Sequence, residues 1–437
     1  MLKSHLSSFL SSHIQPGQIL LVAFSGGLDS RVLLQLLAEA REQHVFQLQA
    51  MYIHHGLSPN ADAWGDFCQQ VCDALDVPFS CQRVQVDTQS GKGLEAAARE
   101  VRYQALLASQ SDHILLAHHQ DDQAETLLLQ LLRGAGSKGL AAMAVRDAER
   151  RLLRPLLDVS RAELLLFAQE GGLQWIDDES NLDITYDRNY CRQQLLPYME
   201  QRFPAVRRTL ARSASHLAEA ADLLDDLAQL DAAQVMVENR LDLKPLAQLS
   251  AARGRNLLRW WLNVNQLPLP NSSRLQEMLQ QLLIAKQGSQ LKVLVGGNVW
   301  LRRYQGYACI ELAGEVTENL ALQWQGEAEL LLPNNGRLLF SWQAGQGLAF
   351  DRLANKVLTI RHREGRERFK PDARRPTRTL RYLYQEHNVP PWQRECQPLI
   401  YSKDQLVIVP GIGVTHSLHA AADELGLVVE WVPVSQS

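Results

Sequence analysis

The chain has 437 residues, of which 46% are hydrophobic and 21% are charged, so it is neither disordered nor of low complexity. Its 44 lysine and arginine residues and 48 aspartate and glutamate residues give a net charge of −4, which excludes a protein that is basic throughout but allows a local basic surface. The length predicts roughly two to four domains, and the lack of a long apolar run predicts a cytoplasmic protein with no membrane span.

The first half of the chain alternates between short apolar runs and segments of helical periodicity. After an amphipathic helix in residues 2–14, the predicted strands are 18–24, 47–53, 79–86 and 112–118, and the predicted helices are 30–42, 61–75, 94–109 and 121–133. Strands that alternate with helices of this length form βαβ units with a parallel sheet. Ligands of such sheets bind at the carboxyl ends of the strands.

The pattern changes after about residue 204. Helices are predicted at 204–230, 242–262 and 271–286, followed by short β-like runs in 291–312 and then by strands with one helix near 378–387. The expected architecture is an α/β, Rossmann-like parallel-sheet domain, a mainly helical domain and a small α+β C-terminal domain. Their expected bounds are 1–215, 216–318 and 319–437.

The six cysteines are too scattered for a disulfide scaffold, and none of them forms a CxxC pair. Cys68 and Cys72 lie four residues apart and would share one helix face. A two-thiol metal clip is one interpretation of this spacing, but two buried small side chains are favoured.

A Ser-Gly-Gly-Leu-Asp-Ser segment directly follows the first predicted strand and begins a helix. Its glycines allow the backbone to approach a charged group closely, and the helix N-terminus offers unpaired N–H groups to an anion. These features predict a phosphate-binding loop, which is not of the Walker A type because no Gly-Lys-Ser/Thr follows. An aspartate beside phosphates favours a bridging cation such as Mg²⁺. The loop consists of Ser25, Gly26, Gly27, Leu28, Asp29 and Ser30.

A second polar segment, at the end of the fourth predicted strand, contains His118, Asp122 and Glu125. If the next helix extends back to His118, this spacing places the three side chains on one face. A histidine and two carboxylates that face a phosphate site suit metal binding or proton transfer. N-capping by the acidic residues and a zinc site are the alternatives. Residues 134–139 match GxGxxG but follow a helix, so a helix C-cap is favoured there.

Two further segments contain clustered charge. Arg99 and Arg102 are three residues apart on one predicted helix face, where a guanidinium would bind a phosphate or simply face solvent. The loop-like segment 178–192 combines several acidic residues with Arg188 and Arg192, which indicates either a substrate site or a surface network.

Residues 361–381 contain eight arginines and one lysine against three acidic residues, for a local charge of +6. Aromatic residues lie within or beside this segment, namely Phe369, Tyr382, Tyr384 and Trp392. In an otherwise acidic chain, this combination predicts a nucleic-acid surface, with Arg378 and Arg381 as candidate contacts. A solvated charged face is the alternative.

Taken together, these motifs resemble a known family. The loop at 25–30 resembles the PP-loop of the N-type ATP pyrophosphatases, which split ATP between its α and β phosphates and adenylate a carbonyl oxygen. Within that superfamily the chain is more similar to the tRNA(Ile)-lysidine synthetases. The segments that carry this similarity are His54-His55-Gly56-Leu57, Arg102-Tyr103, 117–126, 132–140, 178–192 and 368–394. The C-terminal motif departs from the family pattern, since 373–376 replaces a glycine-rich lead and Arg381-Tyr382 replaces a lysine pair.

The resemblance implies ATP-dependent ligation of L-lysine to the wobble cytidine of the isoleucine tRNA with anticodon CAU, which changes the codon read from AUG to AUA. It implies ATP binding by the 25–30 loop and Mg²⁺ binding by Asp29 and Asp122, while Arg102 and His118 assist adenylation. Glu125 would take the lysine ammonium or its proton.

For Arg188 and Arg192, the same resemblance implies contact with a carboxylate or with the RNA. It leaves the oligomeric state open, with a dimer possible. One alternative function is that of a PP-loop tRNA thiolase, which the spacing of the cysteines disfavours. The other is a non-catalytic, nucleotide-dependent RNA-binding protein, which leaves His118, Asp122 and Glu125 without a role.

Overall fold

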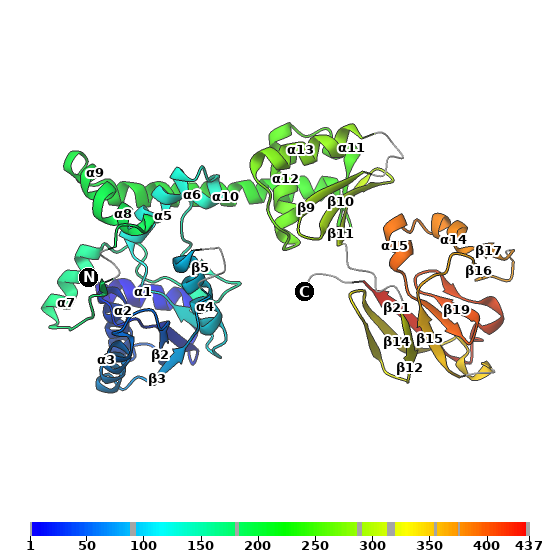
Figure 1. The fold of residues 1–437 in the computed structure, drawn as a ribbon, viewed down its shortest axis with the longest axis horizontal. Helices are drawn as coiled ribbons and strands as arrows, with labels where there is room; N and C mark the ends of the chain where they lie inside the picture. The colour runs from blue at the N-terminus through cyan, green and yellow to red at the C-terminus, as the bar shows by residue number, and fades with distance from the viewer. Residues whose placement is uncertain are drawn as a thin grey trace. The chain divides into compact units, whose positions relative to one another are not determined.

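The computed structural model describes residues 2–87, 93–179, 183–285, 291–312, 320–353, 356–374 and 376–433. They divide into two compact units, Met1–Leu223 and Leu224–Ser437 (Figure 1). Three features of the sequence analysis lie outside the described residues: 180–182 of the segment 178–192, Arg375, and the expected boundary at 318. Among the described helices, none combines the length and the apolar composition that a membrane span needs.

The first unit contains a six-stranded sheet in the order β3-β2-β1-β4-β6-β5. Its strands are β1 (Ile19–Ala23), β2 (Gln47–His54), β3 (Phe79–Arg83), β4 (His113–Leu115), β5 (Arg146–Asp147) and β6 (Leu152–Leu153). All pairs are parallel except β5 with β6, which confirms the predicted α/β class. The chain reverses direction across the sheet at β1, which lies between β2 and β4. The loops after β1 and β4 therefore meet at the switch point where such sheets bind ligands.

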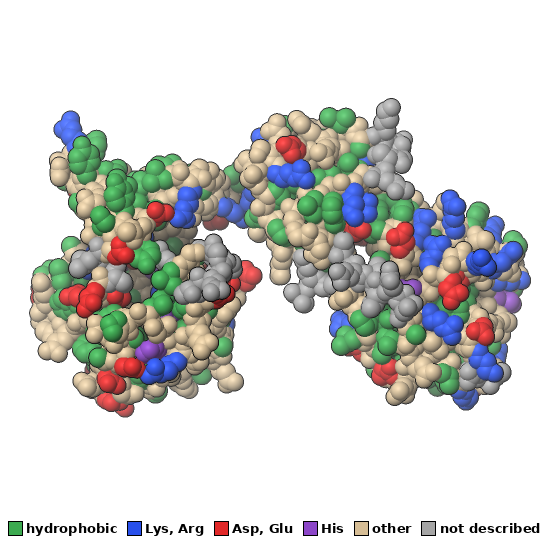
Figure 2. Space-filling model, in the orientation of Figure 1, with side chains coloured by type: hydrophobic (Ala, Val, Ile, Leu, Met, Phe, Trp, Pro, Cys, Tyr) green, Lys and Arg blue, Asp and Glu red, His purple; other side chains and the backbone are tan. Residues whose placement is uncertain are grey.

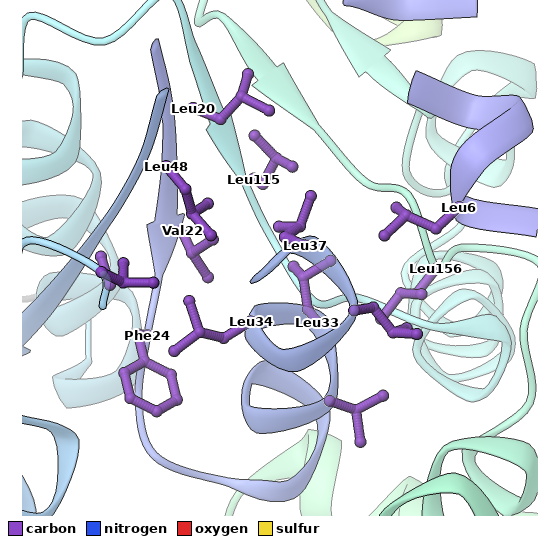
Figure 3. Close-up of a cluster of buried hydrophobic side chains, with 14 of the residues drawn as sticks. Leu6, Leu20, Val22, Phe24, Leu33, Leu34, Leu37, Leu48, Leu115 and Leu156 are labelled. Carbon is purple, nitrogen blue, oxygen red and sulfur yellow. The ribbon is translucent and has the colours of Figure 1, made fainter. Parts of the chain in front are cut away.

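Helices cover both faces of this sheet. They are α1 (Leu2–His13), α2 (Leu28–Ala40), α3 (Ala61–Ala74), α4 (Leu94–Leu107), α5 (Gln120–Leu132), α6 (Ser137–Leu140) and α7 (Arg161–Glu170). Because side chains alternate along a strand, Val22 of β1 packs in the core that contains α1 and α2, while Leu21 packs with Leu106 of α4. Figure 3 shows Leu33, Leu34 and Leu37 of α2 directed toward the strands in the first of these cores.

The predicted N-terminal helix and the predicted role of two cysteines are confirmed. Leu6 and Leu10 of α1 are each 1% exposed and belong to the core under α2. Cys68 and Cys72 of α3 are fully buried in the same core, where burial raises the pKa of both thiols. The two cysteines therefore act as small apolar side chains.

The described residues after α7 include α8 (Asp187–Tyr190), a π-helical turn (Cys191–Leu195), α9 (Leu196–Arg202) and α10 (Val206–Val235). The π turn is an infrequent element that is often associated with functional sites. The expected domain boundary at residue 215 falls inside α10, which continues without interruption through it.

In the second unit, three helices accompany a small sheet. The helices are α11 (Leu243–Leu246), α12 (Ala251–Val264) and α13 (Ser272–Ile284). The strands are β7 (Met236–Val237), β8 (Arg240–Asp242), β9 (Lys292–Gly296), β10 (Val299–Tyr304) and β11 (Tyr307–Leu312), in the order β7-β8-β11-β10-β9. The prediction of one helix over 242–262 is wrong, because Ser250 accepts a hydrogen bond from the Arg253 backbone and begins α12 as a separate helix.

The remainder of the second unit is mostly β-structure. One sheet has the order β12-β15-β18-β19-β20, a second has the order β13-β14-β21, and β16 pairs with β17. The strands are β12 (Ala321–Trp324), β13 (Glu329–Leu332), β14 (Gly336–Ala344), β15 (Leu358–Arg361), β16 (Arg368–Phe369), β17 (Arg378–Thr379), β18 (Leu399–Ser402), β19 (Gln405–Val409), β20 (Gly413–Val414) and β21 (Leu425–Val432). The predicted helix near 378–387 is α14 (Leu380–Glu386), and α15 (Pro391–Cys396) was not predicted.

Candidate active site

The loop after β1 forms a cradle at the N-terminus of α2. The hydroxyl oxygens of Ser25 and Ser30 lie 3.1 Å apart, and the Ser30 hydroxyl donates to the Gly27 carbonyl at 3.0 Å. Gly26 adopts φ +79°, and a Cβ added there would lie 2.5 Å from a methyl carbon of Ile176, so a larger residue does not fit. The first N–H groups of α2 have no intrahelical partner and are available to an anion.

Next to this cradle, His119 connects the loop after β1 to the start of α5. Its ring is 1% exposed, and Nε2 lies 3.5 Å from a carboxylate oxygen of Asp29 and 3.5 Å from one of Asp122. Nδ1 lies 3.9 Å from Asp121. Burial lowers the pKa of His119, but these carboxylates outweigh it and raise the pKa above its ordinary value. The three aspartates around His119 therefore favour its protonated form.

His118 was predicted in place of His119 on the expectation that the helix extends back to His118. The helix begins at Gln120, and His119 is its N-cap, with a backbone N–H that donates to Asp122 at 3.0 Å. The prediction that His118, Asp122 and Glu125 share one helix face is therefore wrong for His118. An N-cap histidine followed by two acidic residues was the signal that could have identified His119.

Asp122 and Glu125 do lie on one face of α5, where each meets two arginines from the segment after α7. Arg188 donates to Glu125 at 2.9 Å and to Asp122 at 3.0 Å. Arg192, in the π turn, donates to Glu125 at 2.6 and 3.0 Å and to Asp122 at 3.0 Å. The structure thus brings together four residues that the sequence analysis selected in two distant segments. We refer to them as the ion-pair cluster.

The two carboxylates of the ion-pair cluster are buried, the two arginines are partly exposed, and the four charges compensate one another. Glu125 has no exposed surface, and Asp122 is 7% exposed. Burial favours the neutral form of Asp122, but the charges of His119 and Arg188 hold its pKa well below its usual range. The carboxylates in turn raise the pKa of Arg188 and of Arg192 in spite of burial. A substrate can consequently contact Glu125 only if Arg188 or Arg192 gives up its hydrogen bonds to this carboxylate.

His118 has the opposite electrostatic environment. Burial and the positive charges of Arg154, Arg188 and Arg99 lower the pKa of His118 to about 3, against the effect of Asp122. Nε of Arg154 donates to Nδ1 of His118 at 3.3 Å, so the neutral ring carries its proton on Nε2. His118 is a hydrogen-bond donor through Nε2.

Arg154 was not selected from the sequence. It directly follows β6, is 6% exposed, and donates to the Ala144 carbonyl at 2.6 Å, which fixes its guanidinium. The available signal was an arginine at the carboxyl end of a strand. Its burial, which would have singled it out, cannot be read from a local sequence pattern.

Arg102 lies at the edge of the site beside the end of β2. Its exposed side chain donates from Nε to His55 at 3.4 Å. Burial and the charge of Arg102 lower the pKa of His55 to about 4, so this histidine is neutral. Arg99 donates to the hydroxyl of Tyr103 at 3.2 Å on the same helix, α4.

For a metal ion, Asp29 is the better fit of the two expected ligands. Its Oδ1 is buried without a hydrogen-bond partner among the described residues, and such an oxygen suits a hard cation. Both oxygens of Asp122 already accept hydrogen bonds, from Arg188, Arg192 and the His119 backbone. Within the described ranges, protein side chains alone form no metal site, since no group of three or more His, Cys, Asp or Glu residues is suitably placed.

The basic segment 361–381 belongs to the second unit. Arg378 lies over the ring of Tyr382 at 4.1 Å and pairs with Glu386 at 3.3 Å, while Arg381 is exposed. Two of the aromatic residues noted in the sequence are core residues instead, because Phe369 is 2% exposed and Tyr384 has no exposed surface. Only Tyr382, at 48%, is a largely exposed ring of that set.

The parallel sheet and the cradle at its switch point define the first unit as a nucleotide-binding domain of the PP-loop class. Comparison with protein families agrees: residues 2–199 match a family described as "PP-loop domain". Residues 241–309 match "TilS substrate binding domain", and residues 358–431 match "TilS substrate C-terminal domain".

Curated proteins extend this match over the whole chain. A tRNA(Ile)-lysidine synthase of Nitrosomonas europaea is 45% identical over 97% of this chain and 94% of its own length. Proteins of the same name from Coxiella burnetii and an Azoarcus species are 38% and 41% identical, over 94% and 97% of this chain and 93% of each relative. The chain therefore belongs to the tRNA(Ile)-lysidine synthase family and is an ATP-using tRNA-modifying enzyme.

Proposed function

We propose that this chain joins L-lysine to the wobble cytidine of the isoleucine tRNA with anticodon CAU and releases AMP and pyrophosphate. Family membership supports this activity, and so does one observation above all: the PP-loop cradle lies beside two buried carboxylates that are paired with two partly exposed arginines. The cradle suits ATP, and the ion-pair cluster suits an amino acid that carries both charges.

In the first step, the cytidine C2 oxygen attacks the α-phosphorus of ATP, and pyrophosphate leaves. The cradle of residues 25–30 holds the phosphates through backbone N–H groups and the hydroxyls of Ser25 and Ser30. The imidazolium of His119 and the Nε2–H of His118 stabilise negative charge that develops there. Arg102, exposed at the same edge of the sheet, adds a positive charge for phosphate.

We further propose that Mg²⁺ binds with ATP and that Asp29 is its protein ligand. The unpaired buried Oδ1 of Asp29 supports this assignment. Asp122 would bind the ion only if an arginine of the ion-pair cluster or His119 gave up its contact with the Asp122 carboxylate. When bound, the ion neutralises phosphate charge and orients the phosphates.

In the second step, the side-chain amine of lysine attacks C2, and AMP leaves with the oxygen. This amine has a pKa of about 10.4 in water, so it must lose a proton before it attacks. We assign the ion-pair cluster to lysine, whose carboxylate would replace Glu125 or Asp122 as partner of an arginine. An ammonium group of lysine, or its proton, would then go to the released carboxylate. The lysine carboxylate takes the place of a protein carboxylate beside the arginine, and the lysine ammonium takes the place of the arginine beside the released carboxylate. Every buried charge therefore keeps a partner of opposite sign.

The remaining assignments follow from this reaction. The region 1–215 would carry catalysis, 216–318 would bind substrate tRNA, and 319–437 would bind tRNA through Arg378 and Arg381. A cytoplasmic location is proposed because the substrate is tRNA. A dimer is a possible state, which sedimentation would test.

The deciding experiment follows AMP release from α-labelled ATP with a CAU isoleucine tRNA transcript. AMP release should require both tRNA and lysine, and mass spectrometry should find one lysine adduct on the anticodon cytidine. Without lysine, an adenylated tRNA should accumulate. If AMP release did not depend on lysine, or if the product carried sulfur in place of lysine, the proposal would be rejected in favour of another PP-loop reaction.

A further inference from the structure

Helix α9 and the turn that follows it each expose an aromatic ring that the proposed reaction does not use. Tyr198 is 75% exposed and Phe203 is 61% exposed. Residues 202–206, 209 and 210 line an open hollow of about 360 Å³. Figure 2 shows hydrophobic side chains at the tip of α9, with a basic side chain beside them. Exposed rings that gather in this way mark a contact surface.

The charge around these rings is mostly positive, since the one acidic residue between them, Glu200, is paired with Arg207. Residues 201–218 contain four arginines and no acidic residue, in a chain whose net charge is −4. Three of the four arginines, Arg202, Arg208 and Arg212, are exposed. Tyr198 and Arg202 are four residues apart on α9 and share one face. We name this set of Tyr198, Arg202, Phe203, Arg208 and Arg212 the α9–α10 surface.

The fourth arginine anchors the α9–α10 surface to the active site. Arg207 pairs with Asp121 at 3.0 Å and with Glu200 at 2.7 Å. Asp121 is the second residue of α5 and one of the three aspartates around His119. The first turn of α10 is therefore fixed at the catalytic edge of the sheet, four residues beyond Phe203.

We propose that the α9–α10 surface binds the single-stranded nucleotides that flank the target cytidine in the anticodon loop. Phe203 and Tyr198 stack on bases, and the three exposed arginines contact phosphates. This inference rests on the proposed function and adds to it a binding site for the RNA next to the reacting base. The matched family ranges end at residue 199 and resume at 241, so most of this surface falls between them.

Charge complementarity favours RNA over a second protein chain as the occupant. Aromatic rings interleaved with arginines are the usual platform for single-stranded nucleic acid, because every base has a face that stacks. A protein interface of this kind would have to supply acidic partners for three exposed arginines.

The test measures binding of a CAU anticodon stem-loop RNA by fluorescence anisotropy over a series of salt concentrations. Phe203→Ala and Tyr198→Ala should each weaken binding by about 5- to 100-fold with the salt slope unchanged, since stacking involves no counterion release. Arg208→Ala should lower the slope by about one unit. Phe203→Trp should restore affinity. Leu166→Ala, at a 55% exposed leucine of α7, is the matched control and should bind like the unmodified chain.

Equal affinity of Phe203→Ala and the unmodified chain would overturn the inference, as would a lack of measurable stem-loop binding by the unmodified chain. It would also be overturned if Phe203→Ala altered only the sedimentation coefficient, since the surface would then join two copies of the chain. Lysine ligation to full-length tRNA is measured first on the unmodified chain. If the unmodified chain did not ligate lysine, the proposed function would be rejected. If it did ligate lysine but the variants bound the stem-loop as well as the unmodified chain, only the role of the α9–α10 surface would be rejected.

Discussion

Arg154 donates a hydrogen bond from Nε to Nδ1 of His118 at 3.3 Å and thereby determines which ring nitrogen of His118 carries the proton. With Nδ1 occupied as an acceptor, the hydrogen lies on Nε2. Burial and nearby positive charge lower the pKa of His118 to about 3, so the ring stays neutral at the pH of the cell. His118 is thus suited to donate a hydrogen bond and not to remove a proton.

Replacement of Arg154 should disturb this arrangement. Arg154→Met is expected to slow adenylation by about 10- to 100-fold, because the donor loses its fixed orientation. It should also raise the pKa of His118, because Arg154 is one of the positive charges that lower it, and so move the acid limb of the pH–rate profile to higher pH. Single-turnover pyrophosphate release in the absence of lysine, followed from pH 4.5 to 8.5, measures both effects. Arg150→Met, at an exposed arginine three residues before β6 ends, is the control. An unchanged profile for Arg154→Met would show that Arg154 has no positioning role.

The two adjacent histidines should affect stability with opposite pH dependence. His118 has a lowered pKa, so between its unfolded value near 6.5 and about 3 the unfolded chain binds a proton that the folded chain does not. His118 therefore destabilises the fold as pH falls through this window. His118→Asn should lose less stability than the unmodified chain between pH 6.5 and pH 4.5.

For His119, the pKa is raised in the fold, so its stabilising contribution is complete below about pH 6.5 and is lost as pH rises through the raised value. His119→Asn should therefore cost more stability at pH 6 than at pH 9. Urea unfolding of both variants at several pH values gives the slopes. For each variant, the slope is that of its stability relative to the unmodified chain, plotted against pH. If the two variants gave slopes of the same sign, the assigned charge states would be contradicted.

Asp29→Asn tests the proposed metal ligand. The change keeps the shape but removes the charge from a carboxylate whose buried Oδ1 has no hydrogen-bond partner among the described residues, so we expect a 10²- to 10³-fold loss in AMP formation with the fold retained. Thermal unfolding and AMP formation are measured on the same sample over a range of Mg²⁺ concentrations. Near-normal AMP formation would remove Asp29 from the mechanism.

Glu125→Gln separates the two chemical steps. Glu125 is the fully buried partner of Arg188 and Arg192, so loss of its charge should slow the lysine step more than adenylation and raise the apparent KM for lysine. Stability should fall by about 3 kcal/mol, because two arginines lose a buried partner. Quenched-flow assays with α-labelled ATP resolve the steps. Equal slowing of both would indicate an ATP-site role instead.

Arg381→Ala and Arg378→Ala test tRNA docking. Each should weaken binding of full-length tRNA and lower the salt slope by about one unit per lost phosphate contact, with turnover at saturating tRNA nearly unchanged. Arg381 is exposed, whereas Arg378 also pairs with Glu386, so the slope should change more for Arg381→Ala. A collapse in turnover at unchanged affinity would show that this segment is not a docking surface.

Local sequence patterns were sufficient for strands β1 to β4 of the sheet and for the phosphate cradle, but they did not predict the two-residue strands β5 and β6. Apolar runs bounded by glycines predicted β1 within one residue at each end, and the cradle follows directly from the two glycines and the helix that they precede. Such features depend on backbone geometry over a few adjacent residues. The resemblance of separate motifs to one family was equally visible, because each motif is contiguous in the chain.

The charge state of the site depends on contacts between distant segments, which local patterns do not contain. Arg188 and Arg192 meet Glu125 across 63 and 67 residues of chain. Because the pKa of a group depends on its burial and on the charges around it, adjacent His118 and His119 acquire opposite protonation behaviour. Burial likewise separates Phe369 and Tyr384, which stabilise a core, from the exposed Tyr382. Composition places all three in a basic, aromatic segment, but only packing assigns each side chain to the interior or to solvent.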